Sequence, residues 1–260
     1  MRNMKDHLGR ETAYPFPPKR VVSLCPSITE TLFDLGLTEK EVVGRTRYCI
    51  HPESLVKQVR TVGGTKKIKT DVVAELKPDL IIAEKEENPK ETIEALEKDF
   101  PVFVADVRSY EDALTMIRDL GKLLDREKKA EALTEKIEQK FDFFGRVSPR
   151  SMAYLIWKNP YMAAGSDTFI DSMLQKAGFT NVFANRPERY PEIEVADLRQ
   201  ASPEFVFLSS EPYPFQDADR KELREHLSGC EIVAIDGEIC WYGSRMLKAA
   251  DLLNQLSETL

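Results

Sequence analysis

Residues 126–146 read REKKAEALTEKIEQKFDFFGR, and this stretch near the middle of the chain organises the rest of the fold. It contains no proline and consists mainly of strong helix formers. Apolar side chains recur in it at spacings of three and four, so they fall on one face of a helix. They are Ala130, Leu133, Ile137 and Phe141. Such a helix would be roughly 30 Å long, and we expect it to act as a strut.

Strand and helix patterns alternate on both sides of this stretch. Apolar runs typical of buried strands occupy residues 20–24 (RVVSL), 79–83 (DLIIA), 152–157 (MAYLIW) and 204–208 (EFVFL). ELKPDLIIA in the first half parallels RQASPEFVFLS in the second, since each has a short helical segment, a proline and a buried strand. The pattern predicts an α/β fold with two parallel-sheet, Rossmann-like lobes, one long backbone helix between them and a ligand cleft between the lobes.

A chain of 260 residues is long enough for two such lobes. We expect a lead-in at 1–18, an N-terminal lobe at 19–124, the linking helix at 125–147 and a C-terminal lobe at 148–260. Because one helix forms the linker, a small hinge motion is expected between the lobes.

The composition excludes several classes of protein. A hydrophobic content of 42% and a charged content of 31% are typical of a soluble globular chain. The net charge of −7 argues against a nucleic-acid partner, and no apolar run is long enough to span a bilayer. We also expect a monomer.

The N-terminal sequence MRNMKDHLGRETAYPFPPKR is charged throughout and lacks the apolar core of a secretory leader, which favours a cytoplasmic location. No C-x-x-C pair occurs among the cysteines, so we expect free thiols. The cysteines are Cys25, Cys49, Cys230 and Cys240.

In open parallel sheets, ligands bind beyond the carboxyl ends of the strands. In the first lobe the residues that follow strands are Cys25, Ser27, Tyr48, His51, Thr65, Lys66, Lys85 and Glu86. In the second they are Trp157, Asn159, Tyr161, Tyr190, Tyr213, Phe215, Trp241, Tyr242 and Arg245. So many aromatic side chains in post-strand loops suit a large, partly apolar ligand. The alternative is that they only fill the ends of loops.

Helix starts at Ser27, Asp167 and Ser244 would offer backbone N–H groups to an anion or a carbonyl, although helix capping alone also explains these residues. Cys25, Cys49 and His51, with Cys240, would be the ligands of a soft metal if they came together. The alternative is that the thiols are small apolar fillers. No common catalytic motif is present, so we predict a protein that is not an enzyme and requires no cofactor.

The segments RVVSLCPSITETLFDLGL, VVGRTRYCIHP, VGGTKKIKTDVVAELKPDLIIA and WYGSR resemble a known family. This family is the helical-backbone (class III) substrate-binding proteins of ABC importers, and the resemblance runs from about residue 19 to 256. Its members bind vitamin B12, haem or ferric siderophores. The vitamin B12-binding members look most similar.

The resemblance implies roles for individual residues. Pocket aromatics of the vitamin B12-binding members fall on Tyr48, Phe183 and Tyr190, whereas a pocket tryptophan falls on Thr65, which is a departure. Family members dock on their permease through one carboxylate per lobe. The first falls on Asp71. The second falls on Ala196, for which Glu194 or Asp197 would have to substitute.

The resemblance therefore implies reversible binding of a bulky metal chelate, most of all a corrinoid such as cobalamin, with haem or a ferric siderophore as other possibilities and an ABC permease as partner. One alternative is a cytoplasmic relative that acts as a sensor, carrier or chelate-processing protein without a permease. Another is an enzyme on the same scaffold, with a metal at Cys25, Cys49 and His51.

Overall fold

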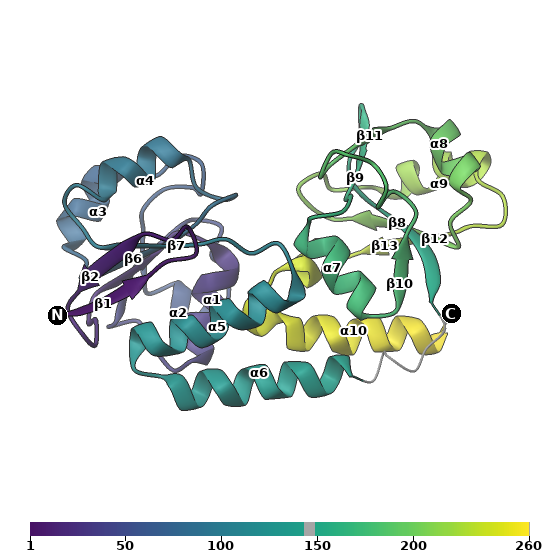
Figure 1. Cartoon of the computed structure of the whole chain (residues 1–260). Helices are drawn as coiled ribbons and strands as arrows, with labels where there is room; N and C mark the ends of the chain where they lie inside the picture. The colour runs from purple at the N-terminus through teal and green to yellow at the C-terminus, as the bar shows by residue number, and fades with distance from the viewer. Residues whose placement is uncertain (143–148, 260) are drawn as a thin grey trace. The chain divides into compact units, whose positions relative to one another are not determined.

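The computed structural model describes residues 1–142 and 149–259, and the chain forms two compact units (Figure 1). Unit 1 contains residues 1–107, 111–136 and 242–245. Unit 2 contains residues 108–110 and 137–241, and the chain from 246 onwards. The α/β class and the two-lobed organisation are confirmed. The units are not two consecutive stretches, because each takes in segments from several parts of the chain.

Unit 1 is built on a parallel sheet with the strand order β5-β4-β3-β6-β7. The strands are β3 (Val21–Ser23), β4 (Val42–Arg45), β5 (Arg60–Thr61), β6 (Leu80–Glu84) and β7 (Val102–Ala105). The helices between them are α1 (Pro26–Asp34), α2 (Glu53–Val56), α3 (Thr70–Leu76) and α4 (Lys90–Leu96). β3 and β6 are apolar and buried on both faces, as expected for a sheet with helices on both sides.

Alternation along the strands decides which helix each side chain meets. Ile81 and Ala83 of β6 pack in one cluster with Val73 of α3 and Ile93 of α4. Leu80, Ile82 and Glu84 point to the other face because successive side chains of a strand alternate. The carboxyl group of Glu84 therefore points to this second face of the sheet, where it is buried.

The N-terminal residues form a hairpin of β1 (Arg2–Lys5) and β2 (Glu11–Tyr14), where the sequence predicts only an extended lead-in. The hairpin lies beside β7, the edge strand of the unit 1 sheet (Figure 1). The backbone N–H of His7 donates to the carbonyl oxygen of Val104 at 3.2 Å. The hydroxyl of Thr12 donates to the carbonyl oxygen of Val102 at 2.7 Å. These contacts occupy an edge that would otherwise be open to pairing.

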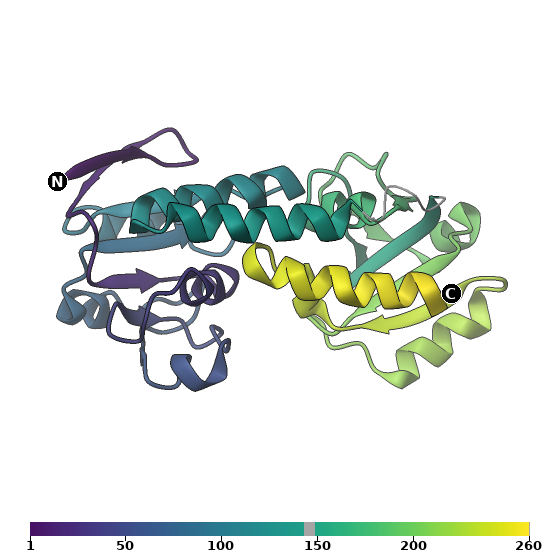
Figure 2. The same cartoon turned by 90° about the horizontal axis from the view of Figure 1, so that it is seen from below.

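The central stretch forms α6 (Glu127–Phe141), which a turn at Asp125 joins to the preceding helix, α5 (Tyr110–Leu124). They run side by side (Figures 1 and 2), and a Cβ at Gly121 would lie 2.4 Å from that of Ala130, so glycine permits their close approach. The expected apolar face of α6 is confirmed for Ala130, Ile137 and Phe141, which are buried, whereas Leu133 is only partly buried and Thr134 is buried beside them. Phe143 to Arg146 of the expected helix lie outside the described residues.

The boundary between the units falls inside α6, after Lys136. The chain also passes between the units after Val107, after Tyr110, after Trp241 and after Arg245. The single linking helix is therefore not directly confirmed, and it and the expected small hinge motion stay predictions.

Unit 2 is built on a sheet with the order β11-β9-β8-β12-β13, and β10 also pairs with β8. The strands are β8 (Arg150–Trp157), β9 (Tyr161–Ala163), β10 (Phe179–Asn181), β11 (Glu192–Ile193), β12 (Phe205–Ser209) and β13 (Glu231–Ile235). β8, β10, β12 and β13 are parallel. β9 and β11 are antiparallel, so the sheet is mixed where strand–helix alternation predicts parallel pairing throughout.

The helical elements of unit 2 are α7 (Phe169–Lys176), α8 (Val195–Ala201), α9 (Asp217–His226), η2 (Gly237–Cys240) and α10 (Met246–Thr259). Leu198 of α8 and Leu223 of α9 pack with Leu155 and Val206 in one buried cluster. No helix within residues 1–142 and 149–259 is both long and apolar enough to cross a membrane.

Candidate functional site

The parallel strands of unit 1 end at one edge of its sheet, and the loops that leave this edge carry the candidates of the first lobe. Cys25 follows β3, Tyr48 lies beyond β4, and Lys85 follows β6. Thr65 and Lys66 belong to the loop between β5 and α3. Topology alone brings these residues together, because the carboxyl ends of parallel strands share an edge.

Tyr48 is the most accessible aromatic side chain at this edge. It is 54% exposed, and the guanidinium carbon of Arg47 lies 5.7 Å from the centre of its ring. A Cβ at Gly64 would lie 3.2 Å from Cε2 of Tyr48, so the pair rests closely on this glycine. A cation beside an exposed ring suits a flat ligand with negative charge. Arg47 is not among the sequence candidates, and its place directly before Tyr48 is the signal that could have found it.

Two lysines lie on the same edge. The Nζ atom of Lys66 donates to the carbonyl oxygen of Glu86, and the Nζ atom of Lys85 lies 2.6 Å from Oδ2 of Asp106. Both lysines are exposed. An exposed ion pair contributes little to stability, so both lysines can exchange these partners for an anionic ligand.

Cys25 and Tyr242 are hidden from solvent rather than presented to it. Sγ of Cys25 lies 3.0 Å from the hydroxyl of Tyr242, and the two residues are 1% and 8% exposed. Burial, together with the negative charges of Glu87 and Glu84, raises the pKa of the Cys25 thiol well above its usual value. We infer that both residues shape the site from below.

Residues 242–245, which we call the strap, belong to unit 1 although the chain on both sides of them belongs to unit 2. Nε of Arg245 donates to Oε2 of Glu30 at 2.7 Å, and both side chains are less than one-tenth exposed. The backbone N–H of Ser244 donates to the hydroxyl of Thr31 at 3.0 Å. Arg245 is therefore committed to α1 rather than open to a ligand.

Ser27 is also internal. It is 6% exposed, and its carbonyl oxygen accepts a hydrogen bond from the Thr31 hydroxyl at 2.8 Å. The helix start expected at Ser27 is not formed as predicted, because α1 begins at Pro26 with Cys25 as an N-cap that makes no side-chain hydrogen bond. Glu30 is drawn instead to Arg245.

The structure does not assemble the candidate metal ligands. Sγ of Cys49 lies 3.0 Å from the hydroxyl of Thr29 and 3.1 Å from that of Thr46. Across the described chain, no three His, Cys, Asp or Glu side chains form a group that could hold a metal ion, so Cys25, Cys49 and His51 are not such a set. Cys240, in unit 2, donates to the Tyr154 hydroxyl at 3.3 Å. All four thiols are free, as expected.

Glu84 and Asn88 lie under the same edge and are missed by sequence reasoning. Oδ1 of Asn88 accepts the N–H of Glu84 at 2.9 Å. Nδ2 of Asn88 donates to the carbonyl oxygens of Leu24 at 3.0 Å and Thr65 at 3.2 Å. One amide thus joins three strand-end loops. Thr65 itself is only 7% exposed. Its carbonyl oxygen has a structural role, since it accepts a hydrogen bond from Asn88.

Unit 2 carries an aromatic cluster beyond the ends of β8 and β12. The rings of Trp157 and Tyr213 meet edge to face at 5.7 Å, and those of Tyr213 and Phe215 do so at 4.9 Å. Phe215 in turn lies parallel to Tyr161 at 6.5 Å. Trp157 is 40% exposed, so the cluster offers part of a large ring to solvent.

Lys158 anchors this cluster from beneath. Its Nζ atom lies 2.7 Å from Asp219 and 2.6 Å from Glu222, and it is 5.8 Å from the centre of the Tyr161 ring. Burial lowers the pKa of Lys158, but the hydrogen bonds that its ammonium group donates to Asp219 and Glu222 outweigh this effect and raise the pKa overall. The ion pairs tie the end of β8, and hence Trp157, to the first two turns of α9.

The remaining candidates of unit 2 are partly buried. Nε1 of Trp241 donates to Oε1 of Glu211 at 2.6 Å. Tyr190 lies in the loop before β11, with the guanidinium carbon of Arg189 5.7 Å from its ring centre. Both rings are half-buried.

The predicted helix caps differ from those observed. α7 begins after Thr168, whose hydroxyl accepts the N–H of Asp171, so Asp167 is not the cap. Ser244 lies within a 3-10 turn (η3, Gly243–Arg245) rather than at the start of α10. The helix-start anion sites expected at these residues are therefore not formed as predicted.

The two carboxylates expected to dock on a permease lie at helix starts. Asp71 is exposed in the first turn of α3. Glu194 is the exposed N-cap of α8 and forms a capping box with Asp197, which also pairs with Arg186 at 2.7 Å. Ala196 carries no charge, so the acidic character here comes from its neighbours.

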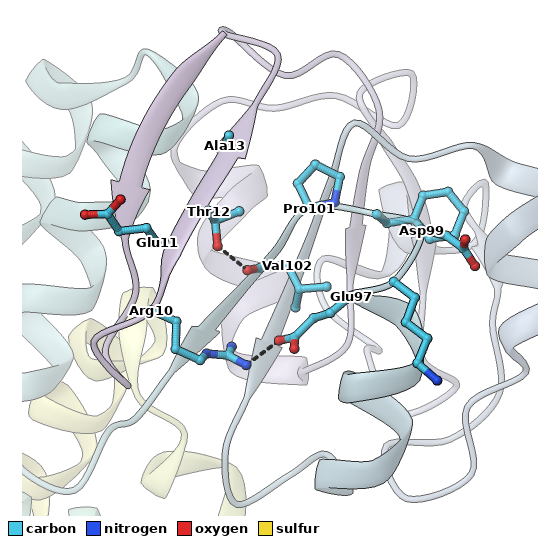
Figure 3. A pocket seen from close by; sticks show the side chains of 10 residues that line it. Arg10, Glu11, Thr12, Ala13, Glu97, Asp99, Pro101 and Val102 are labelled. Atoms are coloured by element: carbon cyan, nitrogen blue, oxygen red, sulfur yellow. Dashed lines mark hydrogen bonds and ion pairs between the residues drawn. The ribbon is translucent and has the colours of Figure 1, made fainter.

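A polar hollow of about 420 Å³ lies elsewhere in unit 1, between the hairpin and the connection from α4 to β7 (Figure 3). Arg10 and Glu97 form an ion pair across it, and the hydrogen bond from Thr12 to Val102 closes its floor. None of the sequence candidates lines it. The ion pair between Arg10 and Glu97 joins the hairpin to the residue after α4, which gives the hollow a structural role.

Comparison with known proteins places this geometry in context. The vitamin B12-binding protein of Vibrio campbellii (strain ATCC BAA-1116) is 24% identical over 198 residues, which cover 74% of this chain and 71% of that protein. The solved periplasmic haem-binding protein of Vibrio cholerae matches with a TM-score of 0.79 and 23% identity, covering 91% of this chain and 98% of the other. An ABC-type Fe³⁺-hydroxamate transport protein from Saccharomonospora viridis matches with a TM-score of 0.74 and 21% identity, covering 99% and 98%.

The predicted cytoplasmic location is wrong. The matching family is one of periplasmic binding proteins, and the haem-binding protein of similar fold is periplasmic as well. Because a leader is removed from a mature exported protein, a charged N-terminal stretch does not identify the compartment. The alternative of a cytoplasmic sensor, carrier or chelate-processing protein falls with this prediction.

The sequence profile described as periplasmic binding protein matches residues 21–234, which is most of the chain. The fold of the chain agrees with the folds of these solved structures. The expected resemblance to the substrate-binding class is confirmed, and the chain belongs to the periplasmic binding protein family.

Proposed function

We propose that this protein reversibly binds a bulky metal chelate, with a corrinoid such as cobalamin as the first candidate, and delivers it to an ABC permease. The observation that carries the proposal is the aromatic cluster of unit 2, in which Trp157, Tyr213 and Phe215 pack edge to face and Trp157 stays 40% exposed. A large exposed ring held by its neighbours suits the flat or domed face of such a chelate. The names of the relatives describe binding rather than catalysis, and binding without chemistry is what we propose here.

A second class of chelate is favoured by the charges of unit 1. Arg47, Lys66 and Lys85 are exposed cations at the strand-end edge, and Arg47 lies beside the exposed ring of Tyr48. Guanidinium and ammonium groups bind carboxylates well. Haem and ferric siderophores carry negative charge, so they are the alternative ligands.

Titration of the purified protein with cyanocobalamin, hemin and a ferric hydroxamate, followed in the visible spectrum, tests the proposal. We expect one of the three to bind at micromolar concentration or tighter. Trp157→Ala should weaken that binding by roughly tenfold, since losing a stacked ring costs about 1 to 1.5 kcal/mol beyond its area.

The matched control is Leu8→Ala. Leu8 is 41% exposed, nearly the same as Trp157, but it lies in the hairpin of unit 1. Its replacement should therefore leave the affinity for the chelate unchanged. Failure of all three chelates to bind at high micromolar concentration would exclude the proposal. Equal losses in the two variants would exclude the aromatic cluster as the contact.

Docking on a permease is proposed through Asp71 and Glu194. Both are exposed at helix starts of different units, and a carboxylate meets a partner's arginine with two hydrogen bonds. Asp71→Asn should leave chelate affinity unchanged and weaken association with the permease.

A further inference from the structure

Glu84 ends β6 with a side chain that is only 2% exposed. Its Oε2 atom accepts the backbone N–H of Glu86 at 2.7 Å and that of Glu87 at 2.9 Å. Its Oε1 atom is buried and has no hydrogen-bond partner of normal geometry within the described chain. A buried carboxylate oxygen without a partner is unfavourable, whereas a neutral carboxylic acid avoids most of this penalty.

The groups around Glu84 also favour its neutral form. The carboxylates of Glu87 and Asp106 act on it, and the Cys25 thiol and the Tyr242 phenol face it from β3 and the strap. Burial is the largest effect, and together with these charges it raises the pKa of Glu84 to about 7, although the backbone N–H groups of Glu87 and Val107 lower it.

The nearby lysines do not offset these effects. Lys85 is turned towards Asp106 at 2.6 Å, and Lys66 donates to the carbonyl oxygen of Glu86. In the parts of the chain that the structure describes, no lysine or arginine forms an ion pair with Glu84.

The segment that Glu84 holds is the turn at residues 85–88. This turn carries Lys85, and the carbonyl of Glu86 within it is the acceptor for Lys66. Asn88 closes the turn by accepting the Glu84 N–H and by donating to Leu24 and Thr65. Glu84 and Asn88 therefore fix three strand-end loops relative to one another.

We propose that Glu84 is a positioning residue of the unit 1 strand-end site. As a neutral carboxylic acid, Glu84 holds the 85–88 turn closed. When it loses its proton to solvent, it releases that turn. Once Glu84 is ionised, its buried Oε1 atom carries negative charge without a hydrogen-bond partner of normal geometry. The carboxylates of Glu87 and Asp106 also repel this charge, so exposure of the side chain to water becomes favourable. The effect of this opening on chelate affinity rests on the proposed function, whereas the proton-linked opening itself does not.

Two measurements without any ligand test the proposal. The first is a carbon-13 NMR titration of protein labelled at the glutamate side-chain carboxyl. We expect one glutamate to titrate near neutral pH and to be missing in Glu84→Gln, which keeps the shape and one acceptor oxygen. Glu94→Gln is the control, because Glu94 is an exposed partner of Lys90 on α4, and it should leave that titration in place.

The second measurement is hydrogen exchange at the N–H groups of Glu86 and Glu87, corrected for the intrinsic pH dependence of exchange. On opening of the 85–88 turn, the pKa of Glu84 should fall to its ordinary value. The equilibrium constant for this opening should then rise roughly thirtyfold between pH 5 and pH 7 and level off above pH 7. The profile of Glu84→Gln should be flat over this range.

Titration of Glu84 together with the exposed glutamates, near the ordinary pKa of 4.5, would overturn the proposal. So would amides of Glu86 and Glu87 whose profiles are the same in wild type and Glu84→Gln. If Glu84→Gln does not fold, the wild-type amide profiles alone decide, since a flat wild-type profile also overturns it. Failure of every chelate to bind would refute the proposed function and leave these results standing.

Discussion

Glu84 links protonation to stability at the scale of a single residue. Its pKa of about 7 in the folded protein lies above the ordinary value of 4.5, so the folded state holds the proton more tightly than the unfolded chain does. The free energy of unfolding that this group contributes is therefore fully present below about pH 4.5. It falls as the pH rises towards 7 and stays low above it.

Replacing Glu84 by Gln should remove this pH dependence. Because one pKa unit corresponds to about 1.4 kcal/mol, we expect the stability of Glu84→Gln relative to wild type to improve by about 2 kcal/mol between pH 5 and pH 8. Urea unfolding at the two pH values measures this change. A constant difference between the two proteins would contradict a raised pKa at Glu84.

Gly243 in the strap is a second residue on which local structure depends. Its φ is +82°, and an added Cβ would lie 2.1 Å from the hydroxyl oxygen of Thr31. Gly229 has a similar φ of +76° but has no atom within 4 Å of such a Cβ. The two positions thus separate backbone strain from steric overlap.

Gly229→Ala should destabilise the protein by about 1 kcal/mol, which is typical of a non-glycine residue in the left-handed region. Gly243→Ala should cost clearly more, because Thr31 or the strap must also move. Thermal unfolding of the two variants side by side gives the difference. Equal losses would mean that the strap adapts without strain.

At the scale of elements, the strap and α1 are joined by a buried ion pair between Glu30 and Arg245. Removing one partner of a buried pair leaves an uncompensated charge and costs about 3 to 5 kcal/mol. Replacing both with apolar residues of similar volume is often close to neutral. The intact pair therefore adds little net stability, whereas the loss of one partner destabilises the protein strongly.

We expect Arg245→Met to destabilise the protein by about 3 kcal/mol or more. The double variant Glu30→Leu with Arg245→Met should recover much of this loss. Chemical denaturation of the single and double variants provides the comparison. If the double variant is as unstable as the single one, packing of the arginine stem rather than charge pairing dominates.

The elements also show what the sequence can and cannot predict. The strands at 79–83 and 204–208 and the apolar face of α6 follow from hydrophobic periodicity, which is a local property. The burial of Cys25 does not follow from it, because its partner Tyr242 is 217 residues away. The Ser27–Glu30 motif fits a capping box locally, yet Glu30 pairs with Arg245 instead. The mixed sheet of unit 2 is missed because β9 and β11 are too short to show a pattern.

At the scale of the whole molecule, covalent neighbours and structural neighbours differ at the strap. Arg245 belongs to unit 1, whereas Met246, the next residue, begins α10 in unit 2. A change at Arg245 should therefore act on α1, which is far away in the sequence, more than on the adjoining helix.

Hydrogen exchange of Arg245→Met tests this expectation. Amide protection in α1 should fall by roughly a hundredfold or more, which corresponds to a loss of about 3 kcal/mol. Protection in the middle of α10 should change much less. The reverse pattern would show that the strap belongs functionally to unit 2.

The strap also sets the order in which the nascent chain can finish folding. Glu30 and Arg245 are 215 residues apart. At roughly 5 to 20 residues per second, about 10 to 40 s separate their synthesis on the ribosome. Until Arg245 emerges, the ion pair between Glu30 and Arg245 cannot form, so this contact between α1 and the strap is made late. The contacts that complete unit 1 thus include some that form only after residue 245 has been synthesised, long after the strands of its sheet.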